Sequence, residues 1–161
     1  MELNGEFDQS RTFLPRFGFE FTTQEKSFKY FGYGPYESYV DMHHGSKMGM
    51  YKSTAEKEYV DYIYPQEHGN HINTKYLALG RYEFISEQGF EFNVSEYSKE
   101  ELTKKTHNFE LEKSDATNVR IDYKVSGIGS NSCGHELAEA YRLNDKMISF
   151  KFSIRKKCCE N

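Results

Sequence analysis

The sequence predicts an all-β domain in which two antiparallel sheets pack face to face. Apolar and polar residues alternate along four runs, at residues 17–22, 90–95, 119–126 and 148–155. This period of two is typical of antiparallel strands with one buried face. Thirteen Tyr and thirteen Phe among 161 residues supply large side chains for a core between the sheets. Helix start signals are scarce, so we expect one or two short helices beside the sheets.

Shorter apolar runs predict further strands at residues 28–33, 76–79, 82–85 and 137–143. Two segments have the composition of tight turns, and each is predicted to close a hairpin. They are Ser86-Glu87-Gln88-Gly89 and Asn144-Asp145-Lys146.

Two segments are helix candidates. The better one begins at Ser98, because Glu101 follows three residues later in the pattern of a capping box. We expect this helix to end near Thr106. The other candidate follows Pro35 and extends from about residue 37 to residue 44, with Gly45 as its stop signal.

The chain is predicted to form a single β-sandwich domain over residues 1–161, without a linker or a fixed-period repeat. Between about residues 32 and 73 the alternation disappears. We expect a long ordered loop there, since such loops in compact domains are usually functional or packed on themselves. Eight of the thirteen tyrosines lie between Tyr30 and Tyr64, so the loop can contribute its own core.

Charge and cysteine content exclude several classes of protein. The net charge of −4 argues against a surface that follows nucleic acid phosphates. No apolar run approaches the roughly 18 residues of a membrane span, and the first residues lack the features of a secretory signal. The three cysteines are Cys133, Cys158 and Cys159, an odd number without a disulfide framework. We therefore expect a cytoplasmic protein with no nucleic acid and no membrane partner.

The glycine-rich segment GIGSNSCG at residues 127–134 is a candidate ligand-binding turn. It lacks the third glycine of a dinucleotide fingerprint and the Gly-Lys-Ser/Thr ending of a P-loop. A tight turn at the rim of a sheet fits better, either alone or facing a ligand. Cys133 could act as a nucleophile with His135 as its base, but a small residue that lines a pocket or packs under the turn is favoured.

The remaining chemistry candidates are weaker. The histidines at residues 43–44 and 68–71 lack the Cys pair that a zinc site usually includes, so no metal site is predicted. Acidic residues of the long loop could supply a glycosidase pair, but no spacing selects two of them, and solvated loop charge is favoured. They are Glu37, Asp41, Glu58, Asp61 and Glu67. The loop tyrosines suit sugars in principle, but most are expected to pack the loop onto the sheet.

Several motifs occur in a fixed order along the chain. They are LPRFG at residues 14–18, YGPYESY at 33–39 with Asp41, YV-x-Y at 59–62, PQE-x-GN at 65–70, YS-x-x-x-L at 97–102, His107, ID at 121–122 and SGIGSNSCG at 126–134. Together they resemble the C-terminal domain of glycoside hydrolase family 2 β-galactosidases. The order and spacing hold from about Leu14 to Ile154, nearly the whole chain.

The resemblance implies a fold, and it implies that the catalytic residues lie in another part of the complete protein. Complete family members are multidomain retaining glycosidases whose catalytic glutamates lie on a TIM barrel that this chain lacks. Their terminal domain is a supersandwich of the galactose-mutarotase type, and this chain is similar to about the C-terminal half of it. The chain alone is therefore expected to be inactive, with no catalytic residue. It is also expected to hold no cofactor, because the Mg and Na ions of complete enzymes are bound mainly elsewhere.

The resemblance also implies a substrate site. In the family, the glycine-rich turn presents one side chain to the sugar pocket, either Trp or Cys, and the matching residue here is Cys133. Asn131 and Ser132 precede it and are taken as substrate-binding with it. His135 stands where relatives commonly have Pro. Residues 65–67 are expected to fix the loop.

Two classes of function remain open at this point. The first is a domain of a β-galactosidase, which hydrolyses terminal β-D-galactosides such as lactose. Its partners would be the remaining domains of that chain, the galactoside substrate and further copies in a homo-oligomer. The second is a free-standing carbohydrate-binding or interaction sandwich without catalysis.

Overall fold

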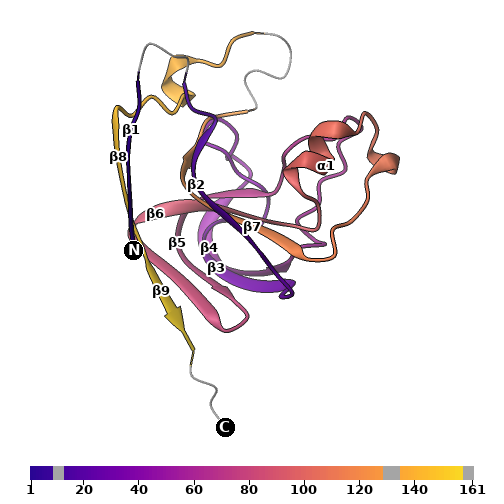
Figure 1. The fold of residues 1–161 in the computed structure, drawn as a ribbon, viewed down its shortest axis with the longest axis horizontal. Helices are drawn as coiled ribbons and strands as arrows, with labels where there is room; N and C mark the ends of the chain where they lie inside the picture. Colours follow the sequence, from indigo (N-terminus) through magenta and orange to yellow (C-terminus); the bar gives the residue numbers. More distant parts are fainter. Residues whose placement is uncertain (9–12, 129–134, 158–161) are drawn as a thin grey trace.

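The structure is a computed structural model that describes residues 1–8, 13–128 and 135–157 (Figure 1). Within these residues it is almost entirely β, as predicted. The strands are β1 (Glu2–Glu6), β2 (Arg16–Thr23), β3 (Ser27–Gly34), β4 (Lys47–Thr54), β5 (Asn70–Leu79), β6 (Tyr82–Ser95), β7 (Thr117–Val125), β8 (Met147–Lys151) and β9 (Ser153–Lys156). The helices described are α1 (Lys99–Lys104) and the 3₁₀ turns η1 (Asn108–Glu110) and η3 (Glu139–Tyr141).

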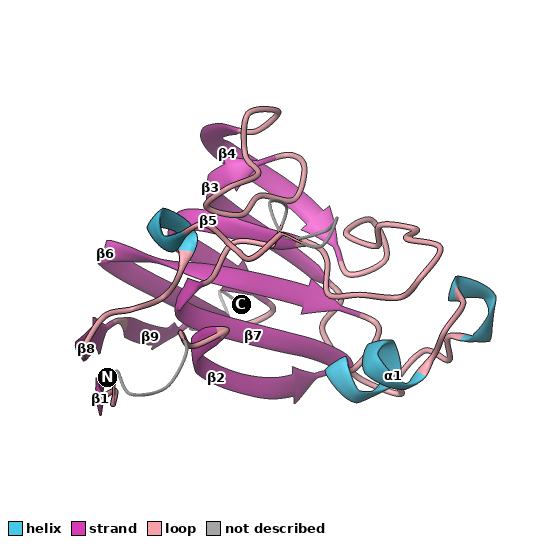
Figure 2. Cartoon of the chain, turned by 90° about the horizontal axis from the view of Figure 1, so that it is seen from above, coloured by secondary structure: helices cyan, strands magenta, loops and turns pink. Residues whose placement is uncertain are grey.

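The strands form a seven-stranded and a two-stranded sheet, all antiparallel (Figure 2). The large sheet has the order β2-β7-β6-β5-β3-β4, with β9 added against β6. Strand β6 is long enough to pair with β9 through its first residues and with β7 through its last ones. The small sheet pairs β1 with β8, which brings residues 2–6 beside residues 147–151.

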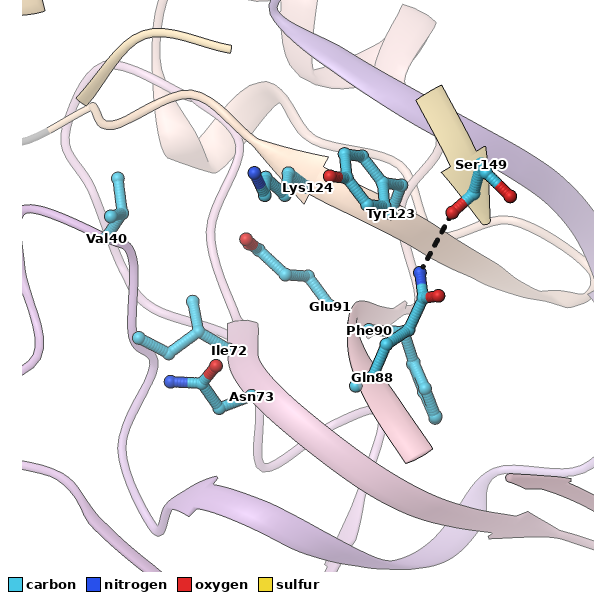
Figure 3. A pocket seen from close by; sticks show the side chains of 10 residues that line it. Val40, Ile72, Asn73, Gln88, Phe90, Glu91, Tyr123, Lys124 and Ser149 are labelled. Carbon is cyan, nitrogen blue, oxygen red and sulfur yellow. Dashed lines mark hydrogen bonds between the residues drawn. The ribbon is translucent and has the colours of Figure 1, made fainter. Parts of the chain in front are cut away.

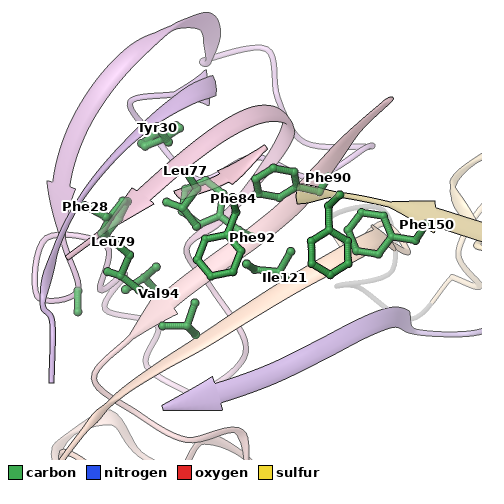
Figure 4. Close-up of a cluster of buried hydrophobic side chains, with 13 residues drawn as sticks. Phe28, Tyr30, Leu77, Leu79, Phe84, Phe90, Phe92, Val94, Ile121 and Phe150 are labelled. Atoms are coloured by element: carbon green, nitrogen blue, oxygen red, sulfur yellow. The ribbon is translucent and has the colours of Figure 1, made fainter. Parts of the chain in front are cut away.

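The apolar core lies on the inner face of the large sheet and continues onto β8 (Figure 4). Phe92 and Ile121 lie opposite each other on β6 and β7, and both are fully buried. Phe150 of β8 joins the same cluster and packs against Tyr123 of β7 with ring centroids 6.2 Å apart. The two sheets are therefore held together by aromatic contacts, as the composition predicts.

The stronger helix prediction is confirmed. Helix α1 begins after Ser98, whose hydroxyl accepts a hydrogen bond from the Glu101 amide at 3.1 Å. Leu102 is its buried residue. The other prediction, a helix at residues 37–44, is wrong. The amide of Ser38 donates to the Asn70 carbonyl, and Tyr39 forms a bridge with Met42, so the backbone groups that a helix needs are used in tertiary bonds.

Both hairpin predictions are wrong. Residues 86–89 lie inside β6, and the chain reverses instead at Gly80 and Arg81, where Gly80 has φ of +55°. Glycine adopts that conformation without strain, which explains why the turn forms there. Residues 144–146 connect Leu143 to β8 and close no hairpin. The strand predicted at 137–143 does not form, and that segment contains η3 and the bridge Leu14–Leu143 instead.

Two further strand boundaries differ from the prediction. The run at 148–155 is divided between β8 and β9 at Phe152, and the two parts pair with different strands. The predicted long loop at 32–73 contains β4, which pairs with β3 along its whole length. We call the irregular remainder, residues 35–46 and 55–69, the covering loop. Within the described residues, no helix has the length and apolar character that crossing a membrane requires.

Candidate functional site

The predicted substrate-binding residues Asn131, Ser132 and Cys133 lie outside the described residues. The structure does describe residues 126–128, which lead from β7 into the glycine-rich turn, and we call these residues the turn base. A cleft of about 510 Å³ opens beside the turn base. Its wall includes Met42 and Gln66 of the covering loop and Arg16 of β2. The cleft is the candidate functional site.

Ser126 anchors the turn base to two other segments of the chain. Its hydroxyl donates to the Leu14 carbonyl at 2.7 Å and accepts from the Leu143 amide at 2.9 Å. Its own amide donates to the Pro15 carbonyl. With its hydroxyl and its amide bonded at only 4% exposure, Ser126 fixes where the glycine-rich turn leaves the sheet.

Asp41 of the covering loop and Tyr141 of η3 bind the next two residues of the turn base. The Ile128 amide donates to Asp41 Oδ1 at 3.1 Å, and the Gly127 amide donates to the Tyr141 carbonyl at 2.8 Å. A Cβ atom at position 127 would lie 2.5 Å from Asp41 Cγ, so only glycine permits this approach. The covering loop and the turn base are thus locked to each other.

Beneath the cleft lies a group of charged side chains centred on Arg16. Its guanidinium donates to Asp122 Oδ2 at 3.2 Å and also to Glu67 of the covering loop. Arg120 Nη2 lies 3.9 Å from Glu67 Oε1 and donates to Asn93 Oδ1 at 2.6 Å. Glu67 is therefore neutralised by two arginines.

Burial raises the pKa values of two acids in this group. The pKa of Glu91 is raised to about 7 by burial, although hydrogen bonds from Asn70 and the Val125 amide favour its ionised form. The pKa of Asp122 is raised to about 6 by burial, and Arg16 and Arg120 oppose that rise. Both side chains lie on the outer face of the sheet, where the covering loop excludes water.

Hydrogen bonds fix the second part of the covering loop, residues 55–69. Glu37 accepts hydrogen bonds from the Tyr62 hydroxyl at 2.6 Å and from the Gly69 amide at 2.8 Å. The Asn93 amide group donates to the His68 carbonyl. These bonds place Gln66 and Glu67 at the cleft, so the predicted role of residues 65–67 in fixing the loop is matched by the contacts of Glu67.

Two of the loop histidines, His68 and His71, are buried and bonded within the chain. His71 is fully buried, with Nε2 at 2.8 Å from Glu58 Oε2 and Nδ1 at 2.9 Å from the Tyr33 carbonyl. Burial lowers the pKa of His68, whose Nδ1 lies 2.8 Å from the Gln66 carbonyl. Among the residues that the structure describes, no group of three His, Cys, Asp or Glu side chains is arranged to hold a metal ion.

The expectation that the loop acids are solvated is wrong for three of them. Glu37 and Glu67 bond the covering loop to itself and to the arginines, and Glu58 is buried against His71. Asp61 matches the expectation closely, since it is exposed and accepts hydrogen bonds from Tyr59 and Asn108 at the surface. Asp41 binds the turn base.

The polar faces of β6 and β7 were expected to face solvent, and this too is wrong. Glu91, Asn93, Arg120 and Asp122 are between 1% and 8% exposed, because the covering loop lies over them. A signal was present in the sequence: Glu91 and Asn93 are on the same face of one run, and Arg120 and Asp122 are on the same face of another. Such complementary groups can be buried together, but the alternation alone does not show what covers them.

Comparison with known proteins identifies the family. Residues 1–154 match the family described as "Beta galactosidase small chain". The chain is 44% identical over 156 residues to the beta-galactosidase of Actinobacillus pleuropneumoniae and 39% identical over 156 residues to that of Staphylococcus xylosus. It is 35% identical over 164 residues to the beta-galactosidase of Kluyveromyces lactis.

These matches cover most of this chain and a small part of each relative. They include 96%, 93% and 96% of the chain, but only 16%, 16% and 15% of the respective relatives. The chain therefore corresponds to about one-sixth of the length of these much longer proteins.

Proposed function

The chain belongs to the beta-galactosidase small-chain family, and we propose that it serves as a domain of a β-galactosidase that forms one wall of the sugar pocket. The observation that carries this proposal is the turn base. Ser126 and Asp41 fix the point from which the glycine-rich turn departs, and the cleft opens beside that point. A rigid support of this kind is what a binding turn needs to hold its side chains in place.

We assign no catalytic carboxylate to the cleft. A retaining glycosidase needs two carboxyl groups about 5–5.5 Å apart that flank the glycosidic bond. Glu67 is bound to Arg16, and Asp122 lies behind the same arginine at 2% exposure. Neither is free to protonate or attack a sugar, so the catalytic acids of the complete enzyme would come from the rest of its chain.

The substrate class follows from the family. The relatives are named beta-galactosidases, and we propose a terminal β-D-galactoside as the substrate of the complete protein. In that site Cys133, with Asn131 and Ser132, would contact the sugar without covalent chemistry. A thiol offers a small apolar contact that leaves room for the ligand.

We also propose that the protein forms a homo-oligomer. Strand β4 is an edge of the large sheet, and Met48 and Met50 on it are 42% and 52% exposed. Phe31 of β3 lies opposite Met50 and is 36% exposed. Open strand edges beside apolar side chains favour association with another chain.

The experiment that tests the proposed function compares the 161-residue chain with a complete β-galactosidase that contains it. Both are assayed with an aryl β-galactoside at equal molar concentration. We expect turnover by the complete protein and none by the chain alone. Turnover by the chain alone that survives repurification would show that it contains its own catalytic pair.

A further inference from the structure

A second pocket arises from the way strand β6 changes partners. Residues 82–85 of β6 pair with β9, and residues 91–95 pair with β7. The residues between them, 86–90, have neither partner on that side. On the other side, the pairing of β5 with β6 shifts register between His71 and Tyr76. The sheet is therefore open in the middle of β6, and a pocket of about 400 Å³ lies there. We call it the β6 pocket.

The walls of the β6 pocket come from several segments (Figure 3). Val40 and Ile72 form an apolar wall on one side, and Tyr123 and Lys124 of β7 lie on the other. The side chain of Glu91 reaches between these two walls. Since Val40 neighbours Asp41 in the covering loop, this loop helps to build both the β6 pocket and the cleft at the turn base.

Two amide side chains project polar groups at the β6 pocket. Asn73 has φ of +52°, a conformation that few residues other than glycine and asparagine adopt easily. No described residue hydrogen-bonds its side-chain amide, which keeps both its donors and its acceptor available. Gln88 also lines the pocket, and its Nε2 donates to the Ser149 carbonyl at 3.3 Å (Figure 3).

Glu91 adds a group that can both donate and accept. It is 8% exposed, and its Oε2 accepts from Asn70 Nδ2 at 2.7 Å, so the carboxyl is held in one orientation. Burial raises its pKa to about 7, so a substantial fraction carries a proton at neutral pH. A protonated carboxyl can donate a hydrogen bond to a ligand hydroxyl.

The charges around the β6 pocket are balanced. Lys124 Nζ donates to Asp145 Oδ2 at 2.9 Å and lies 4.8 Å from the centroid of the Tyr123 ring. Lys124 is paired with Asp145, and Glu91 accepts a hydrogen bond from Asn70, so neither group offers an unpaired charge to an ionic ligand. A neutral ligand with many hydroxyls needs no such charge, and its apolar face can lie against Ile72 and Tyr123.

We propose that the β6 pocket binds one neutral pyranose sugar. Mixed donors and acceptors on Asn73, Gln88 and Glu91 suit hydroxyl groups, and the apolar walls suit the C–H face of the ring. Its volume is near the lower end of the range of roughly 300–1,000 Å³ for small-molecule sites, so one ring fits better than an oligosaccharide. This site differs from the cleft at the turn base, and the inference does not rest on the proposed function.

The test is an NMR titration of the ¹⁵N-labelled 161-residue chain with galactose, glucose and glycerol. We expect either hexose to shift the amide signals of Gly89, Phe90 and Lys124 with a dissociation constant in the millimolar range. Glycerol, a polyol without a ring, should not do so. The signals of Gly127 and Ile128 at the turn base report separately on the cleft, so binding at the two places is distinguishable.

Two variants examine the contacts directly. Asn73→Gly keeps the backbone conformation and removes the free amide, and it should weaken hexose binding about fivefold to tenfold. Tyr123→Phe is a second variant that removes only a hydroxyl from the wall. Lys104→Ala, at an exposed position of α1 that lines neither the β6 pocket nor the cleft, is the control and should leave binding unchanged. Absence of shifts at the β6 pocket, equal shifts with glycerol, or unchanged affinity of Asn73→Gly would each overturn the proposal.

Discussion

Glu91 and Asp122 are buried acids whose protonation is coupled to folding. Their pKa values in the folded chain are about 7 and about 6, well above the reference values of 4.5 and 3.8. The folded state therefore holds these protons more tightly than the unfolded state does. Stabilisation by protonation is complete at low pH and is lost as the pH rises through the folded pKa values.

The first prediction isolates this effect with Glu91→Gln, which imitates the protonated acid. A rise from 4.5 to about 7 corresponds to roughly 3 kcal/mol at about 1.4 kcal/mol per pKa unit. Relative to the unchanged chain, the variant should gain free energy of unfolding between about pH 5 and about pH 8, by up to that amount. Urea denaturation of both proteins at the two pH values measures it. A difference that does not change with pH would contradict the raised pKa of Glu91.

The second prediction concerns Arg16. Replacement by Met leaves Asp122 buried at 2% exposure without its closest cation, and it releases Glu67. Removing one partner of a buried ion pair typically costs about 3–5 kcal/mol. We expect about 3 kcal/mol, because Glu67 is one-third exposed. Urea unfolding gives the value directly.

Lys99→Met is the matched control for Arg16→Met. Lys99 pairs with Glu20 at 3.2 Å, but its side chain is 59% exposed. Exposed pairs contribute about 0–1 kcal/mol, so this variant should be nearly neutral. Equal losses for the two variants would show that the charged group under the cleft is no more important than a surface pair.

At the scale of elements, the turn base and the covering loop behave as one unit. Asp41 of the loop lies against Gly127, and Glu67 of the loop lies against Arg16 of β2. A displacement of either segment therefore moves a wall of the cleft.

The third prediction follows from this contact. Gly127→Ala places a methyl group 2.5 Å from Asp41 Cγ, and overpacking of this kind costs about 1–3 kcal/mol. In the complete enzyme we expect KM for a β-galactoside to rise more than kcat falls. Thermal unfolding and steady-state kinetics measure the two effects. Gly45→Ala is the control, since its new Cβ would meet no atom within 4 Å. If both variants behave alike, the coupling between loop and turn base is absent.

The elements also show what sequence patterns can predict. Alternation identified β2, β7 and the last part of β6 because their inner faces carry Phe, Tyr, Val and Ile at every second position. It did not show that Arg120 and Asp122 are buried, because that depends on a loop from a distant part of the chain. Likewise, residues 86–89 have the composition of a turn. The residues before and after them in the sequence pair with β5, and this pairing keeps β6 continuous.

The candidate site was only partly predictable. Motifs predicted that residues 65–67 help to fix the loop, and Glu67 does so through Arg16. The prediction that the glycine-rich turn faces a ligand concerns residues that lie mostly outside those the structure describes, and it stays a prediction. The link between Asp41 and Gly127 spans 86 positions in the sequence and has no local signature, so it emerged only from the fold. The β6 pocket was not predicted either, since it depends on the exchange of β9 for β7 along one strand.

At the scale of the whole molecule, the exposed edge β4 leads to the fourth prediction. The chain should form dimers or larger species in light scattering, because Met48 and Met50 lie beside unpaired strand atoms. Met50→Glu should shift the distribution toward monomer. Met147→Glu is the control, since Met147 is 81% exposed on β8 of the small sheet. A monomeric unchanged chain at high concentration, or an equal effect of the control, would contradict association through β4.

The central claim is that this domain forms one wall of the sugar pocket and that none of its residues makes or breaks a covalent bond. Steady-state kinetics of Cys133→Ala in the complete β-galactosidase tests it most directly. Loss of one small apolar contact should change KM by about fivefold, which corresponds to roughly 1 kcal/mol, and leave kcat within about twofold. A second variant, Cys133→Trp, should alter affinity more than hydrolysis. A fall of several orders of magnitude in kcat for Cys133→Ala would show that the thiol is catalytic and would contradict the account.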